Sequence, residues 1–580
     1  MNIEHVEKSY QELESDSTLQ NLIAQANARY ILYNTEESKE NFPRYTIKDE
    51  QLNILAFKYL NIGCNYFSEH NYLKASHSLE KGALILEYIH GSIHIQTKNK
   101  KLFCLISALS YYVCFQYSKA FILIGKLESD TMISSLVSLF LNRKFDQLLS
   151  EIDKLITNSS YGDEYLAEHF EEDNATKIYE IIIAKSLNYY VQFYQTGNKD
   201  FLEIAKKDLV NLQEVAAMRG EPDVWWVIRL LLLIIDGFKE SSLWYVLGNY
   251  FNTEDKLPLK YIQSLVYKNG SITELFLTQR NSLPKVLNNK QGSIVSIPTS
   301  SGKTRIGEIA ILNCLLNEPK AKILFIAPYR SLAYEIENSF DEIFSNLDVS
   351  VSHLYGGSLF SKLDERIIDE SSVIVATPEK AKALFRSNED ILSCIKLVII
   401  DEGHLLGTDK RLIVNEMFYE ELKYHVKANG GRFLLLSAVL PNAEDLSEWL
   451  TDSTDNVYKE NWRPSDERIG IMEWNGVSVN LNWKSTDAER NSFNPNFIMR
   501  QKLPKKPKER IMHYFPENKN QAIASTAYKL RKFGPVLIFV GIKKSVFAIA
   551  REYEKCIQPE EQKFRFRNKA NWRAFKLACI

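Results

Sequence analysis

Apolar residues recur at intervals of three and four positions through the first 260 residues of the chain, which contain few glycines and prolines. This spacing places apolar side chains on one face of a helix. One such face comprises Leu52, Leu55, Ala56, Tyr59, Leu60 and Gly63, and another comprises Leu79, Ala83, Leu84, Leu86 and Tyr88. Further helices are predicted over 101–125, 131–157, 163–195, 199–218 and 222–250. Residues 1–260 are therefore predicted to form an all-α region.

The pattern changes near residue 270, where short apolar runs rich in β-branched residues alternate with helical stretches. The runs are Ile294–Ile297, Ile323–Ala327, Val349–Leu354, Val373–Ala376, Leu397–Ile400 and Phe433–Ser437. Strands that alternate with helices are typical of a parallel sheet with helices on both faces. We therefore predict an α/β domain over residues 270–452.

The last part of the chain follows a third pattern. Residues 453–510 lose the alternation and contain four prolines, which predicts a linker with some β structure. Residues 511–580 are predicted to begin a second α/β domain. In this segment we expect a helix over Gln521–Phe533, a buried strand over Pro535–Gly541 with Val536–Val540 at its centre, and a helix from Ser545.

The composition is that of a globular protein of 580 residues, 45% hydrophobic and 25% charged, with a net charge of −2. The length predicts about three domains, and the small net charge means that nucleic-acid binding would need a local groove. The apolar stretch Trp225–Ile235 contains Arg229, which favours a buried helix over a membrane span. The polar amino terminus carries no secretory signal. Seven cysteines without a Cys-x-x-Cys pair argue against a zinc module and predict a cytoplasmic protein.

The strongest chemical motif is the segment Pro298–Thr304, which directly follows the apolar run Ser293–Ile297. Gly302 allows the backbone to approach a phosphate closely, and the following helix directs its positive end at the anion. Lys303 is placed to reach the β- and γ-phosphates, and Thr304 supplies a hydroxyl for magnesium. The other loop residues expected to contact the nucleotide are Thr299, Ser300 and Ser301. A chance Gly-Lys-Thr turn is the alternative, and the flanking strand and helix argue against it.

A second motif follows about a hundred residues later, where Leu397–Ile400 runs into Asp401, Glu402, Gly403 and His404. A carboxylate at the carboxyl end of a buried strand lies where ligands bind in open α/β sheets. Asp401 is therefore a candidate magnesium ligand, and Glu402 is a candidate base for the attacking water. A solvated Asp-Glu pair is the alternative reading. Together the two motifs predict a site for ATP and Mg²⁺.

The series of motifs resembles that of superfamily-2 DExH helicases, and most of all their Ski-like branch. The matching segments are Pro298–Thr304, Ala327–Ala333, Tyr355–Gly357, Ala376–Lys380, Asp401–His404, Leu436–Asn442, Ala443–Leu446 and Trp462–Pro464. The resemblance covers roughly 270–465 well and 511–555 faintly. It implies a RecA-like fold for residues 270–452 and the beginning of a second RecA-like domain over 511–580. Residues 1–260 lie outside it.

The resemblance also implies roles for single residues. Gln279 stands where such helicases carry an adenine-reading glutamine. The residues that would hold a nucleic-acid backbone are Arg330, Gly356, Gly357, Thr377 and Pro378. The residues that would couple hydrolysis to this grip are His404, Ser437 and Ala438. Taken alone, Arg330 could form a surface salt bridge and the two glycines a plain turn. Val439 departs from the family because most helicases carry threonine there.

The carboxyl-terminal part departs further from the family. Such motors close two RecA-like domains over ATP, and arginines of the second domain stabilise the transition state. These motifs are expected more than a hundred residues beyond Val536–Val540, whereas about forty residues follow in the sequence. The arginines of Lys563–Arg567 have neither the spacing nor the context of such motifs. We therefore expect a shortened chain that binds ATP and hydrolyses it poorly.

The sequence thus predicts an ATP-dependent helicase or translocase that acts on single-stranded or partly duplex DNA or RNA. The alternative is a non-catalytic, nucleotide-gated scaffold or regulatory protein. The helical region resembles a tetratricopeptide helix pair at Asn71–Ala75 and Leu79–Ala83, although no fixed 34-residue period is present. Its size suggests a module that docks a protein partner, by analogy with helicases of bacterial antiphage systems.

Overall fold

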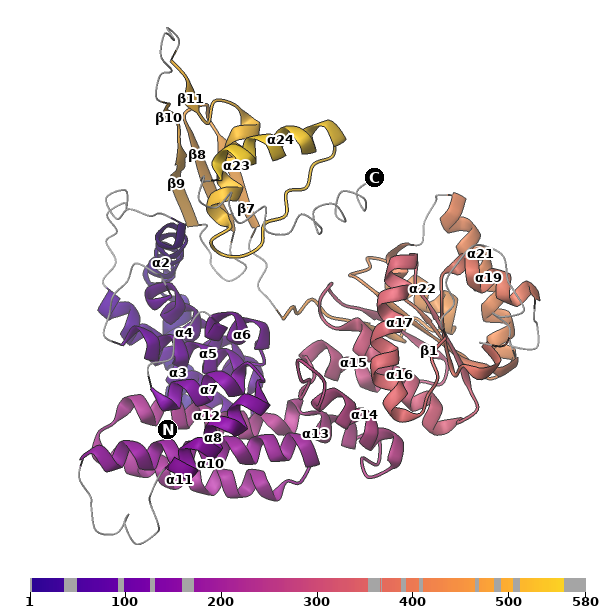
Figure 1. The fold of residues 1–580 in the computed structure, drawn as a ribbon, viewed down its shortest axis with the longest axis horizontal. Coiled ribbons are helices and arrows are strands. Elements are labelled where there is room, and N and C mark those ends of the chain that lie inside the picture. Colours follow the sequence, from indigo (N-terminus) through magenta and orange to yellow (C-terminus); the bar gives the residue numbers. More distant parts are fainter. Residues whose placement is uncertain are drawn as a thin grey trace. The chain divides into compact units, whose positions relative to one another are not determined.

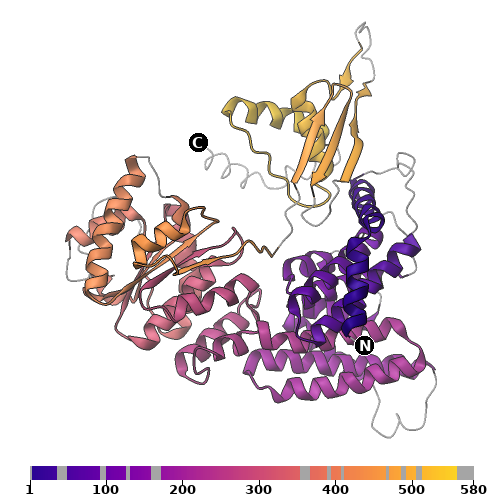
Figure 2. The ribbon, with the colours of Figure 1, turned by 180° about the vertical axis from the view of Figure 1, so that it is seen from behind.

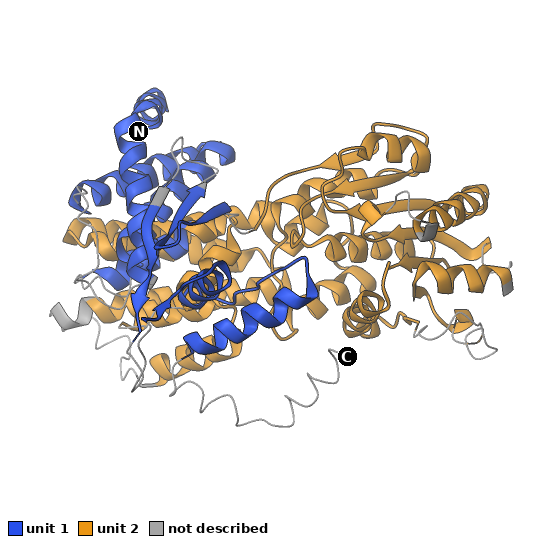
Figure 3. Ribbon diagram, turned by 90° about the horizontal axis from the view of Figure 1, so that it is seen from above, with its two compact units in different colours: residues 1–110, 466–580 blue, residues 111–465 orange. Residues whose placement is uncertain are grey.

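The computed structural model describes residues 3–35, 49–91, 99–125, 131–158, 172–352, 366, 368–387, 393–405, 410–464, 469–484, 492–503 and 512–557 (Figure 1). The chain divides into two compact units (Figure 3). Unit 1 comprises residues 1–110 and 466–580, and unit 2 comprises residues 111–465.

The helices and strands have the following bounds. The helices are α1 Ile3–Ser15, α2 Ser17–Thr35, α3 Asp49–Ser68, α4 Tyr72–His90, α5 Lys100–Val113, α6 Tyr117–Gly125, α7 Met132–Leu141, α8 Phe145–Asn158, α10 Glu172–Thr196, α11 Asp200–Arg219, α12 Pro222–Ser241, α13 Leu243–Gly248, α14 Lys256–Val266, α15 Leu277–Leu287, α16 Lys303–Asn317, α17 Arg330–Phe344, α19 Pro378–Ser387, α21 Lys410–Ala428, α22 Ala443–Thr451, α23 Lys519–Leu530 and α24 Lys543–Cys556. The strands are β1 Gly292–Ser296, β2 Lys322–Ile326, β3 Val373–Ala376, β4 Ile395–Ile400, β5 Arg432–Ser437, β6 Val457–Lys459, β7 Ile469–Trp474, β8 Ser478–Lys484, β9 Ser492–Met499, β10 Gln501–Lys502 and β11 Tyr514–Phe515.

The predicted all-α region is confirmed, but three predicted helices are each split in two. Residues 101–125 form α5 and α6, residues 131–157 form α7 and α8, and residues 222–250 form α12 and α13. The first two breaks lie at residues with a left-handed backbone, Phe115 at φ +63° and Arg143 at φ +55°. Apolar periodicity continues across such a turn because both helices bury a face, so spacing alone does not reveal the break.

The same turn closes the α3–α4 pair, where His70 has φ +59°. In each turn the amide of the left-handed residue donates to the carbonyl three positions earlier, and the next amide donates to the carbonyl five positions earlier. The left-handed residues are His70, Phe115 and Arg143, and an aromatic residue follows each by two positions, namely Tyr72, Tyr117 and Phe145. The unequal spacing of these turns along the chain explains the lack of a fixed period in the sequence.

A six-stranded parallel sheet forms the core of the α/β part of unit 2, with the strand order β3-β2-β4-β5-β1-β6. Helices α16 and α17 cover one face, where Phe325 packs edge-on against Phe340. Helices α19, α21 and α22 cover the other face around a buried apolar cluster (Figures 1 and 2). The predicted α/β domain with a parallel sheet is therefore confirmed, and its fold is that expected of a RecA-like domain.

One predicted strand of this region does not form among the described residues. The run Val349–Leu354 contributes only an isolated bridge between Val351 and Val373, and residues 353–354 lie outside the described part. A sixth strand comes instead from Val457–Lys459, which pairs with β1. This strand lies inside the stretch 453–510 that the prolines predicted to be a linker.

The rest of that stretch contributes to unit 1. Strands β7, β8 and β9 form an antiparallel sheet, and the Asn494 amide donates to the Ala28 carbonyl of α2 at 2.8 Å. Helix α23 contacts β9 and packs against α24. The unit thus combines the first helices with residues from 466 onward, and this grouping differs from the predicted boundaries because contacts between distant segments determine it.

The predicted buried strand at Pro535–Gly541 is wrong. These residues belong to no strand, and the side chains of Leu537 and Phe539 are 92% and 89% exposed. An apolar run forms a strand only where other strands pair with it, and the described residues pair no strand with this run.

The apolar helix α12 is buried in unit 2, as the sequence predicts. None of the helices in the described ranges combines the length and the apolar character that a membrane crossing requires.

Candidate nucleotide site

The predicted phosphate loop connects β1 to α16 at the carboxyl end of the sheet. Gly302 adopts φ +78° and caps the first turn of α16, and Ser300 adopts φ +69°. A Cβ atom on Gly302 would lie 2.1 Å from Nε2 of Gln279, so no other residue fits there without displacing that side chain. Such a loop, followed by a helix amino terminus, presents backbone amides that can receive a phosphate.

Lys303 and Glu402 bring the two predicted halves of the site together. Nζ of Lys303 lies 3.2 Å from Oε2 of Glu402, and the lysine side chain is largely buried. The same carboxylate oxygen lies 3.2 Å from Nδ1 of His404. Glu402 also adopts φ +52°, a conformation that costs energy in a residue other than glycine. The lysine is therefore held by a carboxylate in the position where a phosphate would compete for it.

The chain of contacts continues from His404 to the next strand. Nδ1 of His404 lies 3.4 Å from Oγ of Ser437, the last residue of β5. The hydroxyl of Ser296, at the end of β1, donates to the Ala438 carbonyl and accepts from the Leu440 amide. The three predicted coupling residues thus lie on one connected path beside Glu402.

Asp401 lies at the end of β4, and its side chain is almost fully buried. The pKa of the Asp401 carboxyl is raised to about 6, mainly by burial; the Glu402 amide and Lys303 act to lower this pKa, and the charge of Glu402 acts to raise it. A buried carboxylate with a raised pKa favours a bound cation, because the cation removes the cost of the buried charge.

The donor set around Asp401 suits magnesium better than a fully caged metal. No cluster of three or more His, Cys, Asp or Glu side chains suited to a metal occurs in the described part of the chain. Mg²⁺ usually binds through one or two carboxylates together with substrate phosphates and waters. Asp401 and the hydroxyl of Thr304, the second residue of α16, fit this pattern.

Gln279 contacts the phosphate loop directly. Its Nε2 donates to the Gly302 carbonyl at 3.0 Å, and its Oε1 accepts from the Phe276 amide at 2.8 Å. The hydroxyl of Thr278 donates to the Ser301 carbonyl at 3.3 Å. The amino-terminal turn of α15 is therefore tied to the loop by side chains.

Two aromatic residues at this place were not among the predicted site residues. The ring of Phe276 lies 5.9 Å from that of Trp462, and the Trp462 carbonyl accepts from Ser301 Oγ at 3.4 Å. Trp462 belongs to a segment that carried the family resemblance, which was the available signal. The contact itself could not be predicted, because Trp462 lies far from the loop along the sequence.

The predicted nucleic-acid residues begin the helices that follow neighbouring strands. Arg330 is exposed and starts α17 after β2, and Pro378 starts α19 after β3. Thr377 Oγ1 accepts from the Lys380 amide at 3.4 Å. Since β2 and β3 are adjacent and parallel, these residues lie at the same edge of the sheet. Gly356 and Gly357 lie outside the described residues.

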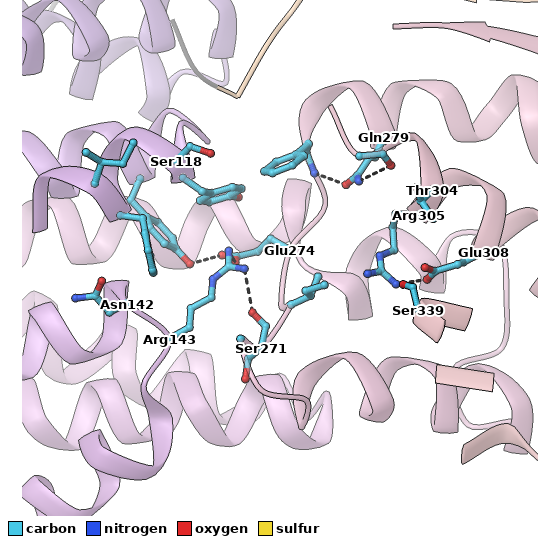
Figure 4. A pocket seen from close by; sticks show the side chains of 18 of the residues that line it. Ser118, Asn142, Arg143, Ser271, Glu274, Gln279, Thr304, Arg305, Glu308 and Ser339 are labelled. Atoms are coloured by element: carbon cyan, nitrogen blue, oxygen red, sulfur yellow. Dashed lines mark hydrogen bonds and ion pairs between the residues drawn. The ribbon is translucent and has the colours of Figure 1, made fainter. Parts of the chain in front are cut away.

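A cavity of about 800 Å³ extends from the phosphate loop to the helical part of unit 2 (Figure 4). The α/β part contributes Gln279, Gly302, Thr304, Arg305, Glu308, Leu332, Glu335, Ile336 and Ser339 to its lining. The helical part contributes Tyr112, Tyr117, Ser118, Phe121, Ile122, Leu141, Asn142 and Arg143. The sequence motifs gave no indication that the helices reach this place.

A buried ionic network fixes the helical side of the cavity. Glu274 accepts from Arg143 at 3.0 Å, from Tyr112 at 2.7 Å and from Tyr194 at 2.8 Å. The Thr273 hydroxyl donates to the same carboxylate at 2.6 Å. These four donors offset the cost of burying the carboxylate, and the network connects α5, α10 and the turn between α7 and α8 to the segment that leads into α15.

A second buried ion pair lies on the α/β side of the cavity. Arg305 and Glu308 pair along the first turns of α16, and the Tyr261 hydroxyl donates to Glu308 at 3.1 Å. Burial raises the pKa of the Glu308 carboxyl, and Arg305 opposes this effect. The helix that begins at the phosphate loop is thereby also connected to α14.

The α/β part that carries this candidate site corresponds to a helicase family model. Residues 277–446 match the family model described as DEAD/DEAH box helicase. The chain therefore contains a DEAD/DEAH box helicase domain, and the proteins it resembles are superfamily-2 helicases.

Among curated proteins, the Hachiman protein HamB of Bacillus cereus is 39% identical over 587 residues, which is 100% of this chain and 51% of HamB. The ATP-dependent DNA helicase Hel308 of Thermococcus kodakarensis is 33% identical over 218 residues, which is 38% of this chain and 18% of Hel308. The chain thus spans about half the length of HamB and a smaller part of Hel308.

Among solved structures, the DUF1998 helicase MrfA bound to DNA has a TM-score of 0.30 at 19% identity, over 34% of this chain and 29% of that chain. A hypothetical ATP-dependent RNA helicase from Sulfolobus tokodaii has a TM-score of 0.27 at 24% identity, over 34% of this chain and 54% of that chain. Both similarities are too distant to place single residues.

Proposed function

We propose that this chain carries the ATP-binding half of a superfamily-2 helicase or translocase of the Ski-like branch, acting on single-stranded or partly duplex nucleic acid. The observation that carries the proposal is the contact path from Lys303 through Glu402 and His404 to Ser437. This path joins the phosphate loop to the end of β5, where hydrolysis could be sensed. It requires both motifs in one site, which a chance resemblance of either motif would not produce.

Each residue of the site has a role that follows from its position. Lys303 would exchange Glu402 for the γ-phosphate of ATP, and the freed carboxylate of Glu402 would accept a proton from the attacking water. Thr304 and Asp401 would hold Mg²⁺, which neutralises charge on the phosphates when bound. Gly302 and the amides of the loop hold the phosphate oxygens.

Coupling of ATP hydrolysis to nucleic-acid binding would involve residues at the carboxyl end of the sheet, where the phosphate loop also lies. Breaking the contact between Glu402 and Lys303 changes the partner available to His404 and, through it, to Ser437. Arg330, Gly356, Gly357, Thr377 and Pro378 would contact the backbone of a strand. Such contacts carry no sequence information and weaken as salt rises. The name of Hel308 as a DNA helicase makes DNA the first strand to test.

The second candidate function is a nucleotide-gated scaffold, which one observation favours. The buried network around Glu274 connects the helical part of unit 2 to the segment before α15. A nucleotide could therefore change a helical surface that docks a protein partner, without strand unwinding. The match of the whole of this chain to about half of the Hachiman protein HamB is the reason to propose a place in an antiphage defence system.

The experiment that separates these functions measures ATP hydrolysis by the full chain alone, with single-stranded DNA and with single-stranded RNA. Glu402→Gln is the control variant, because glutamine keeps the shape of the side chain but accepts no proton. Hydrolysis that a strand stimulates and Glu402→Gln removes supports the helicase. ATP binding with no hydrolysis under any condition supports the scaffold, and no ATP binding at all contradicts both.

A further inference from the structure

The cavity beside the phosphate loop has an outer wall that the helicase motifs do not account for. Four residues of α6 line it, namely Tyr117, Ser118, Phe121 and Ile122, and Asn142 and Arg143 line it from the turn between α7 and α8. Phe121 and Ile122 are 53% and 55% exposed, which is high for large apolar side chains that face a cavity. The inner wall includes Gly302 and Thr304 of the phosphate loop.

We infer that this cavity receives the base and ribose of the nucleotide, and that helix α6 covers the base from outside. The inference rests on the proposed function, because it assumes that the phosphates lie on the loop. A nucleoside attached to phosphates at Lys303 and Thr304 must lie within the length of a ribose and a base. Gly302 and Thr304, on either side of Lys303, line the cavity, which has the size of a small-molecule site.

The chemistry of the two walls suits a planar heterocycle. The helical wall includes the apolar side chains of Phe121 and Ile122. It also includes the polar groups of Ser118 and Asn142 (Figure 4). An aromatic or aliphatic face covers a base, and a few convergent polar groups orient it. The walls thus supply both parts of a base site, and one of them comes from the helical region.

The helical wall is fixed to the nucleotide loop by side-chain contacts. Arg143 is bound to Glu274 and donates to the Ser271 carbonyl at 3.1 Å. The ring of Tyr117, the first residue of α6, stacks on Phe276 at 6.2 Å with an interplanar angle of 26°. The Phe276 amide donates to Gln279, which contacts Gly302.

The consequence is that the nucleotide connects the helicase domain with the helical region. Occupation of the cavity would hold α6 against α16, and the empty cavity would leave the exposed faces of Phe121 and Ile122 uncovered. A nucleotide that covers Phe121 and Ile122 gains affinity from these contacts, and its binding restricts the motion of α6. The helical region would then distinguish the nucleotide-bound state from the free state.

The test compares the affinities of Mg²⁺-ATP and of tripolyphosphate for the full chain by calorimetry. Phe121→Ala and Ile122→Ala should weaken ATP binding by about tenfold and about threefold, and leave tripolyphosphate binding unchanged. Ile204→Ala is the matched control, because this residue is 43% exposed on α11 and does not line the cavity. It should change neither affinity.

The outcomes separate this inference from the proposed function. A wild-type chain that binds neither ATP nor tripolyphosphate contradicts the nucleotide site itself. A wild-type chain that binds ATP, with both affinities unchanged in Phe121→Ala and Ile122→Ala, overturns only the role of α6. A weakening of both ligands to the same extent overturns it too, since the loop would then be damaged.

Photolabelling with 8-azido-ATP gives a second readout that needs no variant. The label should appear on the tryptic peptide formed by residues 120–126, which contains Phe121 and Ile122. A label found only on the peptide that contains Trp462 would place the base on the opposite side of Phe276 and overturn the inference.

Discussion

Two apolar runs of similar composition differ in this chain, because one is buried in a strand and the other is largely exposed and forms no strand. The run Ile294–Ile297 lies in and just after β1, where Ile294, Val295 and Ile297 are fully buried. The run Val536–Val540 belongs to no strand, and its residues Val536, Leu537 and Phe539 are exposed. Each run is followed by a helix that begins with a lysine, Lys303 in α16 and Lys543 in α24.

The difference lies in the neighbours and not in the runs themselves. Strand β1 pairs with β5 along its whole length and with β6 over three residues, and these strands lie more than 130 residues later in the sequence. Helix α16 then covers one face of the sheet. A local sequence can favour extended backbone, but burial depends on strands and helices that distant parts of the chain supply.

The largest expected effect comes from placing a charge in each run. Ile294→Asp puts a carboxylate at a fully buried position without a partner, and we expect it to lower the free energy of unfolding by about 4 kcal/mol or more. Leu537→Asp changes a side chain that is 92% exposed, and we expect a change within about 0.5 kcal/mol. Urea unfolding followed by circular dichroism measures both.

A loss of stability in both variants would show that the second run is buried in solution, and the comparison would fail. A loss in neither would mean that β1 does not lie in the core of the sheet.

The same contrast explains how much of the fold the sequence could predict. Five of the six predicted runs between 294 and 437 form strands, and they could be predicted because each is short, apolar and followed by a helix. The run 349–354 and the run 536–540 have the same local pattern and do not form strands among the described residues. Pattern alone does not distinguish them, since pairing depends on tertiary neighbours.

The site shows a similar division between local and distant information. The phosphate loop and the Asp401–Glu402 pair were predictable because each function needs particular residues at fixed spacing after a strand. The contacts of Gln279 with Gly302 and of Trp462 with Ser301 join segments that lie 23 and 161 residues apart. The helical wall of the cavity carries no motif, so only the folded chain reveals it.

The next effect concerns the carboxyl end of the sheet, where Asp401 directly follows β4. Burial raises the pKa of Asp401 in the folded chain to about 6, above the value of about 3.9 expected in the unfolded chain. The folded state therefore holds the proton more tightly, and this contribution to stability is complete below about pH 4 and is lost as the pH rises through about 6. In EDTA, Asp401→Asn should avoid this loss and exceed the wild type in stability at pH 7 by up to about 3 kcal/mol.

Asp348→Asn is a control with the opposite sign. Hydrogen bonds from Lys260 and Lys256 lower the pKa of Asp348, so ionised Asp348 contributes stability that is lost as the pH falls. Thermal unfolding from pH 4 to pH 8 measures both variants. If the stability of Asp401→Asn and of the wild type varies identically with pH, the carboxyl of Asp401 is not buried as described.

A smaller effect is expected from the lysines that follow the two runs. Lys303→Ala removes a cation from the phosphate loop, and we expect it to weaken Mg²⁺-ATP binding by about 10- to 100-fold, the value of one hydrogen bond to a charged group. Lys543→Ala removes an exposed lysine at the start of α24 and should leave the affinity unchanged. Calorimetry measures both affinities, and equal losses would remove the assignment of the phosphate loop.

The last prediction concerns the exposed run itself and should leave the free energy of unfolding almost unchanged. Proteases cut exposed segments without regular secondary structure, so chymotrypsin should cut first after Leu537 or Phe539, which belong to no helix or strand and are exposed. Phe433 of β5 is 1% exposed and should resist cleavage for as long as the sheet persists. Changing both Leu537 and Phe539 to serine should remove the early cut without a change in melting temperature. Mass spectrometry identifies the sites, and a run 536–540 that survives as long as β5 would mean that a strand or a partner covers it in solution.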